Sequence, residues 1–304
     1  LSVTLAILLT LFSIGVLIYF IHHAAESIQA DHVIADVTDD LNRAIDRLFP
    51  QKIGKTPSPQ QQPLEAIPPN FDGDSYPITT HHSGYIQAID DEKLLEVAQA
   101  YDLILRVEHR PGQFIIKGKP LVMIFPRGKV HKKLNKKIRD TFVIGAQRTQ
   151  QQDVEFAVDQ IVEIAVRALS PGINDPFTAL RCIDRLSEAL CHLVQRDIPS
   201  PYRYDDQNRL RVIANPITFA GVVNTAFNQI RQYADSSVAV RIRLLEAIAQ
   251  IADRTSNPDY HSLLQHHAQM IQHSSVEKVT EESDLQDIEQ QYFLTLKKLE
   301  FKGD

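Results

Sequence analysis

The chain has 304 residues, of which 43% are hydrophobic and 23% charged, a composition typical of a folded protein rather than a disordered one. The formal net charge of −6 gives no support for nucleic-acid binding, because nucleic-acid-binding proteins usually present a basic face. Two cysteines, Cys182 and Cys191, lie more than two turns apart on one expected helix, too far for a mutual disulfide. They indicate a reducing compartment.

An uncharged apolar run opens the chain at residues 1–21. About twenty such residues are what a helix needs to cross the hydrocarbon core of a bilayer. The run has neither the basic segment nor the small-residue cleavage site of a signal peptide, so we expect a transmembrane helix. Because the first residue is Leu1 rather than Met, we expect a fragment of a longer chain.

Two different patterns follow this run. In residues 22–50, apolar residues return at steps of three and four while aspartates occupy the other face, which predicts an amphipathic helix. Residues 51–80 contain several prolines and a run of glutamines at 60–62, which is typical of a linker or surface loop.

Residues 81–127 are expected to form a small α+β unit. Asp90 or Asp91 can cap its helix, which would extend to about Tyr101. The segment 111–121 resembles half of a biotinyl/lipoyl-type barrel, but it has no recognisable lysine attachment site. We therefore interpret the barrel-like unit as a scaffold and expect no cofactor. Strands are predicted at 84–89, 103–107, 113–116 and 120–125.

Residues 127–137 are rich in lysine, arginine and histidine. Such a stretch near a membrane can hold anionic lipid headgroups. The alternative is the solvated face of a helix. Together with the two cysteines, the basic stretch favours a cytoplasmic location for the soluble part of the protein.

A helical domain with one β-hairpin is expected over residues 128–275. Thr149 and Gln152 match a capping box and would start its first helix, which carries an acidic face that includes Asp153 and Glu155. These carboxylates are either a paired site for acid–base chemistry or a solvated face.

The turn between the first two helices of this domain has the highest density of residues with a backbone role. Pro171 cannot continue a helix, and Gly172 permits the backbone of a C-terminal turn. Asn174 or Asp175 would then cap the next helix, with Pro176 at its first position. The candidate residues, for either a structural corner or a functional turn, are Ser170, Pro171, Gly172, Asn174, Asp175, Pro176 and Thr178.

The remainder alternates short breaks with helical patterns. A hairpin is expected near 202–214, where two strand-like runs flank Asp205 to Asn208. Residues 276–304 would end the chain in a polar C-terminal helix. Three further helices are expected at 218–233, 237–253 and 259–273.

Several strings in the chain resemble a known family, the bacterial predicted membrane proteins catalogued as domain of unknown function 2254 (DUF2254). They include residues 148–156, the turn region 168–179, and residues 182–186, 199–203 and 229–233. The resemblance implies several N-terminal membrane helices before a soluble region, so residues 1–21 would be the last of them. It also implies a multi-pass protein of the bacterial inner membrane and no established reaction.

Two functions of different classes remain open. The first is a non-enzymatic assembly, a channel, transporter or envelope scaffold, in which the soluble domain forms homo-oligomers beside the lipid bilayer. The second is a membrane-bound hydrolase or metal-dependent enzyme with its site at the turn 170–178, together with Asp153 and Glu155. We prefer the first, because the chain has no nucleophile elbow, zinc-ligand spacing or phosphate-binding loop.

Overall fold

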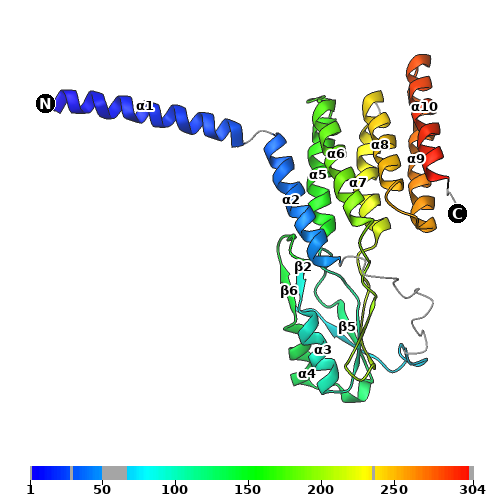
Figure 1. Cartoon of the computed structure of the whole chain (residues 1–304). Coiled ribbons are helices and arrows are strands. Elements are labelled where there is room, and N and C mark those ends of the chain that lie inside the picture. The colour runs from blue at the N-terminus through cyan, green and yellow to red at the C-terminus, as the bar shows by residue number, and fades with distance from the viewer. Residues whose placement is uncertain (1, 28–29, 50–66, 235–236, 301–304) are drawn as a thin grey trace.

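The computed structural model describes residues 2–27, 30–49, 67–234 and 237–300. Within them the protein is mixed α/β, with ten α-helices and two small sheets. Figure 1 shows a row of packed helices above a part that contains the sheets. Most of the Pro/Gln-rich stretch expected over 51–80 falls on residues 50–66, which lie outside the described residues.

The N-terminal helix α1 (Ser2–Ser27) projects away from the rest of the protein (Figure 1). Its large apolar side chains are exposed, among them Leu8, Phe12 and Ile18. In the part of the chain that the structure describes, no helix is long and apolar enough to cross a membrane. The segment expected as a transmembrane helix, residues 1–21, is helical where it is described, and its crossing of a membrane has no support there.

Helix α2 (Ala30–Leu48) packs on α5 (Val154–Ala168) and α6 (Pro176–Leu193). It buries Ile34, Leu41, Ala44 and Ile45, which recur at helical spacing, and this confirms the amphipathic pattern in its described residues. Burying a large aliphatic side chain contributes about 1.5–3 kcal/mol. This apolar stripe therefore holds α2 in the bundle.

Four more helices complete the bundle, and α8 contacts both α6 and α10. The starts of α7, α8 and α9 agree with the prediction to within one residue, but the helix expected to end at 273 continues to 278 and the C-terminal helix expected from 276 begins at 282. Both cysteines are free, as expected from their spacing. The four helices are α7 (Phe219–Tyr233), α8 (Val238–Ala252), α9 (Pro258–Lys278) and α10 (Glu282–Leu299).

The five-stranded sheet has the order β1-β5-β3-β8-β7. All neighbours are antiparallel except β3 and β8, which are parallel, with Leu105 opposite Val212. The strands are β1 (Tyr76–Thr79), β3 (Ile104–Val107), β5 (Pro120–Phe125), β7 (Tyr202–Tyr204) and β8 (Leu210–Ala214).

The second sheet has the order β4-β2-β6. Helices α3 (Asp91–Ala100) and α4 (Lys132–Arg139) belong to the same lower part of the protein (Figure 1). The lysines of α4 are exposed, while its Leu134 and Ile138 are buried. The strands are β2 (Gly84–Ile89), β4 (Phe114–Ile115) and β6 (Phe142–Gly145).

The pairing corrects two expectations. The half-barrel expected over 111–121 is wrong, because the strands of this segment, β4 and β5, belong to different sheets rather than to one barrel wall. The hairpin near 202–214 forms as β7 and β8, but β8 adds it to the sheet of β3 instead of leaving it among the helices. Strand partners about 100 residues apart leave no mark on local periodicity, which reports only which side of a strand is buried.

Candidate ligand-binding site

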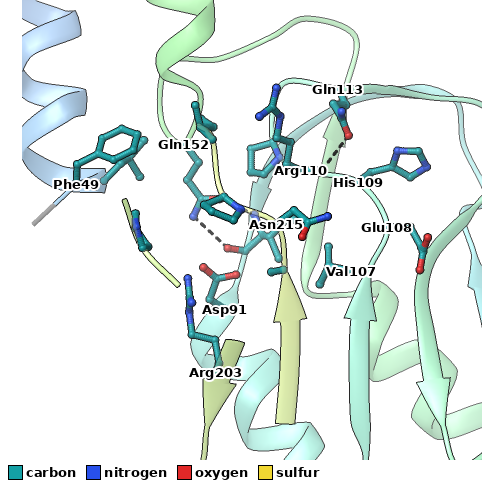
Figure 2. Close-up of a pocket in the computed structure, with 17 residues that line it drawn as sticks. Phe49, Asp91, Val107, Glu108, His109, Arg110, Gln113, Gln152, Arg203 and Asn215 are labelled. Carbon is teal, nitrogen blue, oxygen red and sulfur yellow. Dashed lines mark hydrogen bonds between the residues drawn. The ribbon is translucent and has the colours of Figure 1, made fainter. Parts of the chain in front are cut away.

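A cavity of about 380 Å³ lies where the helical bundle meets the sheets. This volume falls in the range of small-molecule sites. Figure 2 shows side chains from both parts converging on it. Its walls are Leu48, Phe49, Ile89, Asp91, Val107, Glu108, His109, Arg110, Pro111, Gln113, Gln152, Pro199, Arg203, Ala214, Asn215, Pro216 and Ile217.

The parallel pair β3 and β8 positions this cavity. Both strands end at it, since Val107 closes β3 and Ala214 closes β8. Loops that leave the carboxyl ends of parallel strands commonly form ligand sites, because the chain diverges there and leaves a crevice. Helix α3 packs on β8 and places its first residue, Asp91, at the same end.

The bundle closes the other side of the cavity through residues at the ends of three helices. Phe49 follows α2, Gln152 precedes α5, and Ile217 precedes α7. Phe49 and Ile217 are buried, so they supply apolar wall.

The side-chain amide of Gln152 joins the helical bundle to the sheets by hydrogen bonding to the backbone of Ile89 in β2. Its side-chain oxygen accepts from the Ile89 amide at 2.8 Å, and its amide nitrogen donates to the Ile89 carbonyl at 3.0 Å (Figure 2). The predicted capping box is therefore wrong. Asp153, one residue later, caps α5 by accepting from the Phe156 amide at 3.1 Å. Gln152 fits the sequence pattern of a cap, but the end of β2 offers it two unpaired backbone groups instead.

Asp153 and Glu155 do not form a paired-carboxylate site. Asp153 is buried and accepts from Arg148 at 2.8 Å, and Arg148 also donates to Asp159 at 2.6 Å. Glu155 pairs with Arg110, whose Nη2 donates to both carboxylate oxygens, at 3.0 Å to Oε1 and 2.8 Å to Oε2. Each carboxylate thus has its own arginine, and neither belongs to a freely solvated acidic face.

Glu155 is the closer of the two to the cavity, because its partner Arg110 is part of the wall. Burial raises the pKa of Glu155, and the positive charge of Arg110 opposes the rise. A hydrogen bond between two charged groups is stronger than one between neutral groups. The pair therefore fixes the loop after β3 against the start of α5.

The turn 170–178 lies at the other end of α5 from Asp153 and Glu155. A fifteen-residue helix rises about 22 Å, so the structure does not bring these two sets of candidates into one site. The combined site of the hydrolase alternative, the turn together with Asp153 and Glu155, is therefore not brought together among the described residues.

Within this turn the residues have clear structural roles. Asp175 is the cap of α6 and accepts from the Thr178 amide at 3.2 Å and from the Thr178 hydroxyl at 2.6 Å. The Thr178 hydrogen bonds lower the pKa of Asp175. Asn174 holds the left-handed conformation with φ of 49°, while Gly172 has no positive φ and no close neighbour. The permissive backbone expected of Gly172 is thus needed at Asn174.

Asp91, Arg203 and Asn215 line the cavity but were not among the predicted site residues. They become neighbours only through the pairing of β8 with β3 and β7. The one signal in the sequence that could have indicated these three residues is that each is a polar residue within or just after a strand-like run. Among the described residues, no group of three or more His, Cys, Asp and Glu side chains is arranged to hold a metal ion.

Comparison with known proteins identifies the relatives of this chain. Residues 1–250 match the family profile described as "Predicted membrane protein (DUF2254)". Uncharacterized proteins from Mycobacterium bovis and Mycobacterium tuberculosis are each 29% identical over 287 residues, which is 93% of this chain and 54% of theirs. The chain thus spans about half the length of the curated relatives that it matches. No solved structure matches it significantly. The extent of the profile match shows that the chain belongs to the DUF2254 family of predicted membrane proteins.

Proposed function

We propose that this chain is the ligand-binding part of a non-enzymatic, oligomeric membrane assembly of the channel, transporter or scaffold type. The cavity between the bundle and the sheets carries this proposal, because residues from both parts form its walls. A ligand there contacts both parts at once. Its binding energy therefore favours one arrangement of the two parts over others, which is how a binding domain controls an assembly.

Three groups of contacts at this junction would transmit such a change. Gln152 bonds to Ile89, Arg110 to Glu155, and the Arg47 guanidinium donates to the carbonyls of Gln150 and Gln151 at 3.1 and 2.6 Å. All three converge on the start of α5. A ligand that moves the loop after β3 would act directly on this helix and on α2.

Two observations support the proposal that the full-length protein lies in a membrane. The family is described as one of predicted membrane proteins, and the relatives are about twice as long as this chain, which leaves room for membrane segments. The exposed apolar side chains of α1 need cover from lipid or protein, because apolar surface of this extent is unfavourable in water. We place the full-length protein in the bacterial inner membrane as a multi-pass homo-oligomer with this part in the cytoplasm.

The test uses full-length protein in lipid nanodiscs. Particle images give the number of subunits, and thermal melts with a library of small polar molecules reveal ligands. Asn215→Phe fills the cavity from a loop, whereas Gln207→Phe is its control in the exposed β7–β8 turn. We expect an oligomer, and a ligand that stabilises the wild type and the Gln207 variant but not the Asn215 variant. A monomer, or stabilisation that survives Asn215→Phe, contradicts the proposal.

A further inference from the structure

The charged groups of the cavity wall divide into those with partners and those without. Glu108 accepts from Arg106 at 2.8 Å, and Arg110 is held by Glu155. These two charges are therefore neutralised by residues outside the wall. The two remaining are the carboxylate of Asp91 and the guanidinium of Arg203.

Asp91 and Arg203 face each other across the cavity without joining. Figure 2 shows the Arg203 side chain extending from β7 toward the Asp91 carboxylate in the first turn of α3. No hydrogen bond or ion pair links the two, and no described residue donates to the Asp91 carboxylate. The helix cap is supplied by Asp90, whose side chain accepts from the Lys93 amide at 3.0 Å, so Asp91 has no such role.

The guanidinium of Arg203 is held by hydrogen bonds to the backbone just before and at the start of β7. Its Nη1 donates to the backbone carbonyls of Ser200 and Tyr202, which leaves Nε and Nη2 directed at no acceptor among the described residues. The strand position and these two contacts reduce the freedom of the side chain, and preorganised groups bind a ligand at lower entropic cost. Burial raises the pKa of Asp91, and the positive charge of Arg203 opposes the rise. A second cation nearby would stabilise the ionised carboxylate further.

We propose that this cavity binds a small zwitterion with an apolar body, its carboxylate on Arg203 and its ammonium on Asp91. The proposal rests on the proposed function, which makes the cavity a ligand site. A simple anion would meet the repulsion of Asp91, and a simple cation that of Arg203. Phe49, Val107 and Ile217 supply apolar wall for the body of the ligand. An amino acid with an aliphatic side chain has this chemistry and fits within the volume of about 380 Å³.

The test titrates the full chain in detergent micelles by calorimetry at pH 7 with four probes. Leucine has both charges, N-acetyl-leucine only the carboxylate, leucinamide only the ammonium, and N-acetyl-leucinamide neither. We expect leucine to bind at least about tenfold more tightly than the other three, because a hydrogen bond to a charged group contributes more than a neutral one.

Two variants assign each charge to its residue. Asp91→Asn should remove the advantage of leucine over N-acetyl-leucine, and Arg203→Gln its advantage over leucinamide. Glu92→Gln and Arg185→Gln are controls, because both residues are exposed and outside the wall, and both should leave leucine binding unchanged. Thermal melts establish that every variant is folded.

Several outcomes would contradict the proposal that the cavity binds a zwitterion. They are N-acetyl-leucine or leucinamide binding as tightly as leucine, no binding of leucine, and leucine binding that survives Asp91→Asn and Arg203→Gln. A different result tests the proposed function, namely that the cavity binds a ligand at all. If a ligand outside these four probes is blocked by Asn215→Phe, the cavity remains a ligand site and only its assignment to zwitterions is wrong.

Discussion

Gly112 and Asp153 lie so close that a Cβ atom added to Gly112 would be 2.1 Å from the Oδ2 atom of Asp153. Gly112 also has φ of 88°, and its amide donates to the Ile86 carbonyl at 2.8 Å. The loop after β3 thus passes directly over the cap of α5. This contact requires glycine for two independent reasons, conformation and space.

Gly112→Ala should lower the free energy of unfolding by about 3 kcal/mol or more, because it adds a clash to the strain of a positive φ. Gly118→Ala is the matched control. Gly118 has φ of 87° but no atom within 4 Å of the added Cβ, so only strain remains, about 1–2 kcal/mol. Chemical denaturation of both variants measures the difference. Equal losses would show that the Asp153 carboxylate moves aside at no cost.

Gln152→Glu should destabilise the protein more than Gln152→Ala. Alanine removes two hydrogen bonds, about 1–3 kcal/mol together, and leaves the Ile89 groups to water. Glutamate can still accept from the Ile89 amide, but its second oxygen faces the Ile89 carbonyl without a proton to donate. Unfolding curves at pH 7 test this order. A glutamate variant as stable as the wild type would contradict the bonding described here.

The three substitutions Asp175→Ala, Asn174→Val and Gly172→Ala in the turn 170–178 should differ in their effect on stability. Asp175→Ala should cost about 0.5–2 kcal/mol through loss of the α6 cap. Asn174→Val should cost about 1–2 kcal/mol, since a β-branched residue resists a φ of 49°. Gly172→Ala should be neutral or slightly stabilising, because Gly172 has open space and no positive φ. Thermal melts rank the three, and a large loss for Gly172→Ala would refute this assignment.

A functional role for the same corner remains testable beside its structural one. Asp175→Asn keeps a side-chain acceptor for the Thr178 amide, so we expect a stability close to that of the wild type. The experiment measures oligomerisation and membrane function of this variant. Loss of function in a variant that melts and assembles normally would make the corner a functional site.

His267 should make the protein sensitive to acid. Its side chain is buried, Nε2 contacts the Asn224 side chain at 2.9 Å, and Nδ1 has no partner in the described part of the chain. Burial, together with the charges of His266 and Arg231, lowers the pKa of His267 to about 4. Because the folded pKa lies below the value of 6.5 for a free histidine, the unfolded chain binds the proton first. Stability is therefore complete above pH 6.5 and falls as the pH drops toward 4.

The gap between 6.5 and about 4 corresponds to about 3 kcal/mol, which should disappear over this pH range. His267→Gln should flatten the dependence of unfolding free energy on pH. His266→Gln is the control, because His266 is exposed, and its variant should keep the acid-induced loss. If the His267 and wild-type curves stay parallel between pH 6.5 and 4, the buried imidazole is not the cause.

The amino-acid sequence by itself determined where most of the helices lie. The apolar periodicity of α2, the Asp175-Pro176 start of α6 and the break before α7 are local signals, and each depends on residues within a few positions. The spacing of Cys182 and Cys191 was sufficient to exclude a mutual disulfide for the same reason.

Tertiary structure decided the sheets and the site. The parallel pairing of β3 with β8 joins residues about 100 positions apart, and together with the β7–β8 pairing it brings Asp91, Arg203 and Asn215 to one cavity. The same long-range contacts gave Gln152 a partner in Ile89 and moved the cap of α5 to Asp153. The physical reason is that a side chain can satisfy its hydrogen bonds with any backbone group within reach, and the fold determines which groups those are.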